Sequence, residues 1–360
     1  MVTQRKVFFW FWNKYVNVAL IVLGLGVYGC TQEYPAAVGN KLPPETPATS
    51  PASTSACSCS ATGTSSTSGT ATTVTSGTTK VDTLDVAPPR LSPNGGNFYF
   101  STNVKLSSDA LPAQAVYEFS LDNGKSWQTG QEFTVTAGGT VLARLRVGER
   151  PSRSRGASFS IYYQRMLVIG NSIMAHGPAP QLGWYTFNGM AASAPEKDFV
   201  HLLTARLQTL NPAMTYQLQA GTGLELDFGR PSYKMEEFDQ VMQTYKPDLV
   251  VVRLGENVAD GEVPVRGFEG QFRAFVARLT SLSEGRSVRV VTTTSVWEKP
   301  QTDAVIRRVI GEKGWPLVDL QCMVGQSQYA ATQFANPGVA QHPNDAGMQK
   351  IADLIWEKIQ

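Results

Sequence analysis

The chain has 360 residues, a length that accommodates about two domains. Its hydrophobic share of 42% and charged share of 17% are those of an ordinary globular protein, and its net charge of +2, without a run of Lys or Arg, argues against a nucleic-acid partner. The four cysteines form neither paired CxxC motifs nor a His-rich cluster, so we expect no metal site and no other cofactor.

The start of the chain predicts an export signal. Basic residues come before an apolar run over residues 18–27, which is short for a membrane span of about 20 residues, although an uncleaved anchor helix is the alternative. The following letters, VYGC, resemble the lipobox of bacterial lipoproteins. The resemblance implies cleavage after residues 1–29 and lipid on Cys30. We therefore expect an extracytoplasmic protein, anchored through Cys30 to a bacterial membrane, at the outer membrane or cell surface.

Residues 30–87 have a different composition. Ser, Thr, Ala, Gly and Pro dominate, and large apolar residues are scarce. Such a segment buries too little surface to offset its ordering entropy, so a flexible linker is predicted. Cys57 and Cys59 lie within it, and we expect no catalytic role for either thiol.

Residues 88–163 predict a β module. Short, mostly alternating apolar runs occupy residues 98–100, 104–106, 116–119, 133–135 and 141–147, with Gly-rich turn signals between them. Several short strands in so small a segment favour an immunoglobulin-like (Ig-like) sandwich. The segment YEFSLDNGKSW resembles Ig-like modules attached to secreted carbohydrate enzymes. Its Tyr117 and Trp127 either stack on sugars or pack within the module, and packing is the favoured interpretation.

Residues 164–360 alternate strands with helices. Continuous apolar runs, typical of strands buried on both faces, occupy residues 166–169, 249–252, 288–291 and 317–320. Helical periodicity is found around residues 199–207, 238–245, 268–279, 305–310 and 351–359. The pattern predicts an α/β domain with three layers and a doubly wound, flavodoxin-like parallel sheet.

Candidate catalytic residues follow the expected strands. Ser172 and Asn257 each come just after a strand, a Gly-Thr-Gly turn contains Gly223, and His342 precedes the last helix. In an open α/β sheet these strand-end loops meet at one edge. Ester hydrolysis needs a hydroxyl, an imidazole to deprotonate it and preorganised donors for the oxyanion, and these residue types supply all three.

This arrangement resembles the SGNH, or GDSL-type, hydrolase family over residues 165–360. The matching segments are GNSI, the looser GTG, GENV and HPNDAG. By this match Ser172 is the nucleophile and His342 its base, while Ser172, Gly223 (in preference to Gly221) and Asn257 donate to the oxyanion. Asn171 and Val258 stand where the family usually has Asp.

The orienting group of His342 is left open. The family usually has Asp three residues before the His, where this chain has Val339. A backbone carbonyl, a side chain from elsewhere or no group at all then fixes the imidazole, and we expect a dyad in place of a triad. Asp345 is an alternative, but a role at the start of the last helix is favoured for it.

Other polar and aromatic residues near Ser172 are candidates for the substrate pocket. They are Asn171, His176, Trp184 and Glu256. Trp184 belongs to an aromatic, Gly-rich loop over residues 183–193, for which a pocket wall is favoured over simple packing. Glu225 either binds substrate hydroxyls or faces solvent. His201 has no evident partner, and Cys322 is expected to be buried or inert.

The leading hypothesis is an ester hydrolase that removes acyl groups, and O-acetyl groups in particular, from a carbohydrate through an acyl-enzyme on Ser172. This substrate rests on family resemblance and on the attached module. One alternative is a noncatalytic glycan-binding lipoprotein. Another is a lipase or acyltransferase that takes longer acyl chains.

Overall fold

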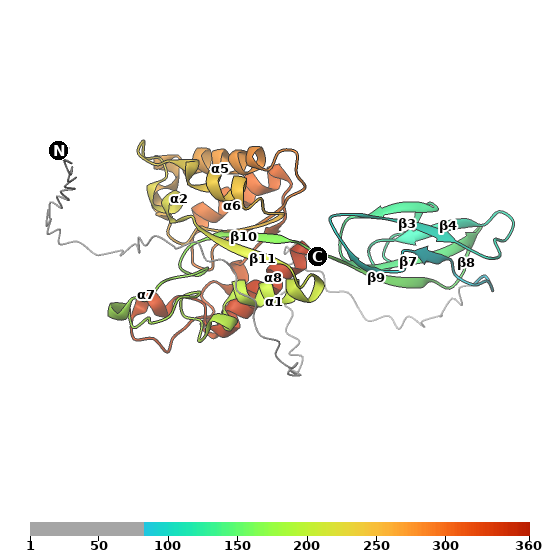
Figure 1. Ribbon diagram of the computed structural model, residues 1–360, viewed down its shortest axis with the longest axis horizontal. Coiled ribbons are helices and arrows are strands. Elements are labelled where there is room, and N and C mark those ends of the chain that lie inside the picture. Colours follow the sequence, from blue (N-terminus) through green and yellow to red (C-terminus); the bar gives the residue numbers. More distant parts are fainter. Residues whose placement is uncertain (1–82) are drawn as a thin grey trace, which may run out of the picture. The chain divides into compact units, whose positions relative to one another are not determined.

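The computed structural model describes residues 83–360, in which a β module is followed by an α/β domain (Figure 1). The expected signal segment, Cys30, Cys57, Cys59 and nearly all of the expected linker lie outside the described residues, so these expectations stay predictions. Within the described part of the chain, no helix is both long and apolar enough to cross a membrane.

The β module has two sheets that share one apolar interior. One sheet has the order β1-β3-β6, and the other β2-β9-β7-β4-β5 with β8 beside β7. The strands are β1 (Arg90–Ser92), β2 (Gly96–Phe98), β3 (Thr102–Ser107), β4 (Val116–Ser120), β5 (Gln128–Thr129), β6 (Glu132–Val135), β7 (Gly139–Val147), β8 (Arg150–Pro151) and β9 (Arg155–Ile161). This agrees with the predicted all-β module, while its likeness to Ig-like modules stays a prediction.

Strand β9 and the packing of Trp127 are two features of the module that can be compared with the predictions. Strand β9 was not predicted, because its sequence RGASFSI alternates small and polar residues with only two large apolar ones. Trp127 is half-buried, and the guanidinium carbon of Arg144 lies 3.8 Å from its ring centroid. This contact supports the packing interpretation of Trp127.

The α/β domain contains a five-stranded parallel sheet of order β11-β10-β12-β13-β14. The strands are β10 (Arg165–Gly170), β11 (Thr215–Ala220), β12 (Leu249–Arg253), β13 (Arg289–Thr293) and β14 (Leu317–Val318). This order confirms the doubly wound, flavodoxin-like prediction. Strand β11 was missed because it is an edge strand without a continuous apolar run.

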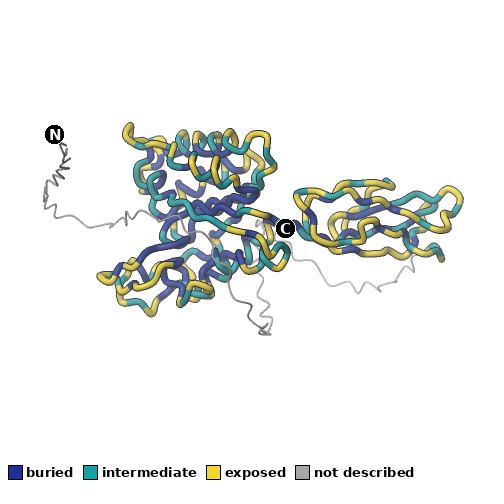
Figure 2. Tube along the Cα trace, in the orientation of Figure 1, coloured by how far each residue is buried: buried dark blue, intermediate teal, exposed yellow. Residues whose placement is uncertain are grey.

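Helices cover both faces of this sheet (Figure 1). The α-helices of the domain are α1 (Phe199–Leu210), α2 (Thr222–Asp227), α3 (Asp239–Thr244), α4 (Val263–Arg266), α5 (Phe268–Leu282), α6 (Pro300–Lys313), α7 (Pro337–Ala340) and α8 (Asp345–Ile359). Alternate residues of each strand face opposite ways: Val168 packs in the core beneath α1 and α8, whereas Leu167 and Ile169 pack in the core beneath α2, α3, α5 and α6. Figure 2 accordingly shows the middle of the sheet as buried.

The connections after β10 and β12 position the candidate site. Strand β10 is flanked by β11 on one side and β12 on the other, so the order of strands reverses at this point. A crevice for ligands forms beyond the carboxyl ends of strands at such a reversal. Later in the sequence, Asn344 caps α8 by accepting from the N–H of Gly347 at 3.0 Å. This bond fixes the chain just after His342.

Candidate active site

Ser172 and His342 are hydrogen-bonded, although 170 residues separate them in the chain. The Oγ of Ser172 lies 2.8 Å from Nε2 of His342. Ser172 follows the end of β10, where Gly170 makes a sharp exit possible: a Cβ at that position would lie 2.7 Å from Cβ of Met174. The structure therefore brings together the two residues that the sequence paired.

A backbone carbonyl orients the imidazole. Nδ1 of His342 lies 2.7 Å from the carbonyl oxygen of Gly338, in α7. Because a carbonyl can only accept, the proton of a neutral imidazole is on Nδ1, and Nε2 is left as the acceptor for the hydroxyl of Ser172. The ring of Trp297 packs edge-on against His342 with a centroid distance of 5.3 Å. Of the alternatives left open by the sequence, the backbone carbonyl is the one observed.

Burial keeps His342 neutral. Its side chain is 6% exposed, and loss of solvation lowers the pKa of His342 to about 4, an effect that Arg253 reinforces and that the Gly338 carbonyl and Glu256 oppose. The imidazole is therefore uncharged at neutral pH, the state in which it can accept a proton from Ser172.

The three candidate oxyanion donors are Ser172, Gly223 and Asn257. The N–H of Gly221 already donates to the carbonyl of Gly170 at 2.8 Å, whereas Gly223 lies in the first turn of α2, where N–H groups lack partners within the helix. Gly223 is also close to Glu237, whose Oε1 would lie 3.1 Å from an added Cβ. Nδ2 of Asn257 donates to Glu225 at 2.8 Å, which uses one of its two N–H groups.

A buried polar network lies beneath Ser172. Arg253 donates to both carboxylate oxygens of Glu256, at 2.7 and 3.1 Å, and neither side chain has more than 1% of its surface exposed. Nδ2 of Asn171 donates to Glu256 at 2.8 Å and to Glu225 at 3.0 Å. Asn171 and Glu256 were predicted to line the pocket. They are instead buried beneath the site, where their side chains bond to each other.

The pKa values of the two buried glutamates are shifted in opposite directions. Burial disfavours ionisation of Glu256, but the adjacent Arg253 and the bond from Asn171 leave the pKa of Glu256 below its usual value. Burial and the negative charge of Glu256 raise the pKa of Glu225 to about 7, against hydrogen bonds that favour the carboxylate. Neither Glu225 nor Arg253 was predicted from the sequence to belong to this network. A charged residue closing the apolar strand LVVVR was the one available signal.

His176 and Trp184 are also buried. Both side chains are less than 5% exposed, and the indole N–H of Trp184 donates to the carbonyl of His176 at 3.1 Å. This differs from the expected pocket wall, because Trp184 packs into a small core cluster with Met190 and Val339. The exposed aromatic residues of this loop are Tyr185 and Phe187, at 69% and 40%.

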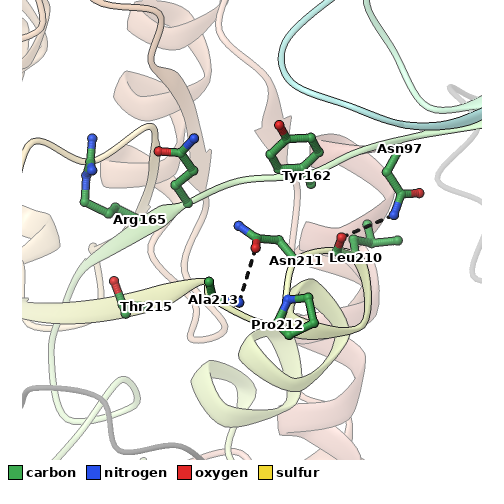
Figure 3. Close-up of a pocket in the computed structure, with 9 residues that line it drawn as sticks. Asn97, Tyr162, Arg165, Leu210, Asn211, Pro212, Ala213 and Thr215 are labelled. Atoms are coloured by element: carbon green, nitrogen blue, oxygen red, sulfur yellow. Dashed lines mark hydrogen bonds between the residues drawn. The ribbon is translucent and has the colours of Figure 1, made fainter.

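Two cavities bear on the location of the site. One, of about 380 Å³, is lined by the neighbours of His342, Gln341 and Pro343, together with Trp297 and Tyr329. Another, of about 590 Å³, lies at the amino ends of β10 and β11, where Asn211 closes a turn by accepting from the N–H of Ala213 (Figure 3). Ser172 follows the carboxyl end of β10, so the second cavity is at the opposite end of the strand from the candidate site; the first is lined by residues on either side of His342 but by neither His342 nor Ser172.

Other candidates occupy structural positions. Asp345 is the first residue of α8, as expected, but its carboxylate accepts from the N–H and the hydroxyl of Ser193, while Asn344 caps the helix. His201 does have partners: Nδ1 contacts Asp198 at 2.8 Å and Nε2 contacts the hydroxyl of Tyr216 at 3.2 Å. Cys322 is half-buried against the core. Among residues 83–360, no group of three His, Cys, Asp or Glu side chains is placed to hold a metal ion.

Comparisons with known proteins give partial structural matches. No family model and no curated protein matches the chain. A Bacteroides ovatus protein described as a GDSL-like lipase matches at 11% identity and a TM-score of 0.36, over 53% of this chain and 95% of that one. A Desulfitobacterium hafniense protein described as lipolytic and of the G-D-S-L family matches at 14% identity and a TM-score of 0.37, over 54% of this chain and 98% of that one. The YxiM protein of Bacillus subtilis matches at 15% identity and a TM-score of 0.35, over 76% of this chain and 78% of that one.

Proposed function

We propose that this protein is a serine ester hydrolase with Ser172 as nucleophile and His342 as general base. The observation that carries the proposal is the distance of 2.8 Å between Oγ and Nε2, with Nδ1 held by the Gly338 carbonyl. This geometry gives the imidazole the tautomer that accepts the proton of the hydroxyl.

In the proposed reaction, Nε2 of His342 takes the proton of Ser172 as Oγ attacks the carbonyl carbon of the ester. The tetrahedral oxyanion is stabilised by N–H donors at Ser172, Gly223 and Asn257. The protonated imidazole then gives its proton to the departing alkoxide, and the alcohol leaves. A water molecule, deprotonated by the same Nε2, attacks the acyl-enzyme and frees the carboxylic acid and Ser172.

We place the substrate among acylated carbohydrates, with O-acetyl groups as the acyl part. Support comes from the exposed rings of Tyr185 and Phe187 on the loop that follows Ser172, and from the cavity beside His342 with walls from Trp297 and Tyr329. Aromatic faces of this kind pack well against sugar rings. The anchor on Cys30, at an extracytoplasmic membrane surface, belongs to the same proposal.

The test is hydrolysis of phenyl acetate by the purified full-length chain. Ser172→Ala should reduce kcat by several orders of magnitude. Ser193→Ala is the matched control, because Ser193 is an exposed serine bonded to Asp345, and it should keep the wild-type rate. A fluorophosphonate probe should label wild type and not Ser172→Ala. Full activity in Ser172→Ala would refute the proposal, and absence of labelling in wild type would favour the noncatalytic glycan-binding protein.

The acyl preference is tested separately. Acetyl and octanoyl esters of phenol, and acetylated xylan, are compared under the same conditions. Faster turnover of acetyl esters with release of acetate from the polysaccharide supports the carbohydrate substrate. A preference for octanoyl esters, or transfer of the acyl group to an added sugar, supports the lipase or acyltransferase instead.

A further inference from the structure

Glu225 is a buried carboxylate that has no assigned role in the proposed reaction. It lies in α2 and is 1% exposed. Its Oε1 accepts from the N–H of Gly255 at 2.6 Å, from Nδ2 of Asn171 at 3.0 Å and from the N–H of Asn257 at 3.3 Å. Its Oε2 accepts from Nδ2 of Asn257 at 2.8 Å. All four partners are donors, and each belongs to a loop that forms the candidate site.

Asn257 depends on Glu225 for its orientation. Both its backbone N–H and its side-chain amide bond to the one carboxylate, and no other acceptor is found for that amide among the described residues. An amide nitrogen has two N–H groups, so one can be held by Oε2 while the other donates to an oxyanion. A fixed donor stabilises an oxyanion much better than a mobile one, because it needs no reorganisation during the reaction.

We infer that Glu225 is a positioning residue that holds the oxyanion-donating amide of Asn257 in place only while Glu225 is ionised. The inference rests on the proposed function, since it assigns a role within the same site. Protonation would put a hydrogen on Oε2, the oxygen with the single partner. With its hydrogen directed at Nδ2, Oε2 cannot accept from that N–H, and in any orientation it has lost the negative charge that strengthens the bond, so the amide of Asn257 would no longer be held firmly.

The surroundings of Glu225 place this switch in an accessible pH range. Glu256 is the negative group that acts on it, and the positive group Arg253 donates to both carboxylate oxygens of Glu256. Asp227 on the same helix pairs with Arg230, and Glu237 accepts from the hydroxyl of Tyr233. Burial and Glu256 raise the pKa of Glu225 to about 7, well above the pKa of about 4 to which burial lowers His342. The two groups therefore titrate in separate ranges.

The experiment is the pH profile of kcat for phenyl acetate between pH 4 and 9 with the full-length chain. Wild type should lose activity below an apparent pKa near 7. In Glu225→Gln, kcat at pH 8 should fall roughly 10- to 100-fold, a fraction of the loss of a whole donor, while KM changes little. The fall in kcat below pH 7 is the acid limb of the profile, and the activity that remains in Glu225→Gln should show no such limb near 7. A wild-type kcat and an unchanged limb in Glu225→Gln would overturn the inference.

Asp303 provides the matched control. It is another buried carboxyl near Glu256, and burial raises its pKa to about 6, but it bonds to the N–H of Ser295 and not to Asn257. Asp303→Asn should therefore keep the limb near 7. If it removes the limb, the titrating group is Asp303 and the inference fails.

A second variant covers the case in which Glu225→Gln does not fold. If Glu225 acts through Asn257, then Asn257→Ala has no amide to release, and its residual activity should lack the limb near 7. Persistence of that limb in Asn257→Ala would also overturn the inference. Labelling of Ser172 by the fluorophosphonate probe distinguishes the two failures, because it tests the nucleophile irrespective of what happens to the limb.

Discussion

Nδ1 of His342 is 2.7 Å from the carbonyl oxygen of Gly338, four residues earlier in the chain. This carbonyl takes the place of a carboxylate as the group that fixes the imidazole. A carbonyl fixes the tautomer as well as a carboxylate does, but it carries no negative charge to stabilise the imidazolium. The low pKa of His342 that follows from burial is consistent with this difference.

Restoring an acid at position 339 should not create a triad. Val339 has no exposed surface and packs with Trp184 and Ala331. In Val339→Asp, an unpaired carboxylate would be buried, so the free energy of unfolding should fall by roughly 3–5 kcal/mol. Urea denaturation measures this loss, and Val339→Ala, which removes the same contacts without adding charge, should lose less. A rise in kcat without loss of stability would contradict the packing described for Val339.

The titration of His342 should make stability depend on pH. Its pKa is about 4 in the folded protein and near 6.5 when unfolded, so the unfolded state binds more protons between these values. The contribution is fully present above pH 6.5 and is lost as pH falls towards 4, by up to about 3 kcal/mol. Denaturation of wild type and His342→Gln at several pH values isolates this term, since the other groups titrate in both. Parallel curves for the two proteins would show that His342 does not titrate this way.

Loss of the Asn257 amide should act on the rate of reaction and leave binding nearly unchanged. An oxyanion forms after the substrate is bound, so Asn257→Ala should lower kcat by roughly 10²–10³ with little change in KM. Steady-state kinetics at pH 8.5, where Glu225 is ionised, is the measurement. Asn103→Ala is the control, because Asn103 bonds to Thr134 within the β module. Equal rates for Asn257→Ala and wild type would show that Asn257 does not donate to the oxyanion.

Substitutions of the neighbouring aromatic residues Trp184 and Tyr185 should affect different properties of the protein. Trp184 is 3% exposed, so Trp184→Ala should lower the free energy of unfolding by about 3–5 kcal/mol. Tyr185 is 69% exposed, and Tyr185→Ala should change stability by about 0.5 kcal/mol or less while raising KM for acetylated xylan. Thermal or urea denaturation, together with kinetics on the polysaccharide, separates the two effects. Equal stability losses would indicate that Tyr185 is packed in solution.

The strand-end residues and the fold class follow from local sequence patterns. Continuous apolar runs ending at Gly170 and Arg253 require strands buried on both faces, and the helical periods between them require helices to cover those faces. Parallel strands linked in this way bring their carboxyl ends to one edge. This rule applies to Ser172 and Asn257, which follow β10 and β12, whereas His342 follows no strand and its pairing with Ser172 was implied by the resemblance to the SGNH hydrolase family. Edge strand β11 escaped prediction, because partial exposure leaves it no continuous apolar run.

Tertiary structure alone decided which atoms orient and surround these residues. The Gly338 carbonyl could not be predicted, because every residue has a carbonyl and no residue type indicates which one points at Nδ1 of His342. Glu225 in a short helix was compatible with solvent or substrate contact, and its burial depends on how α2 packs against the loop after β12. Desolvation and hydrogen-bond geometry are set by that packing. Sequence thus determined which residue types follow the strands of the sheet, and the tertiary structure decided which groups contact them, in what orientation and with what charge.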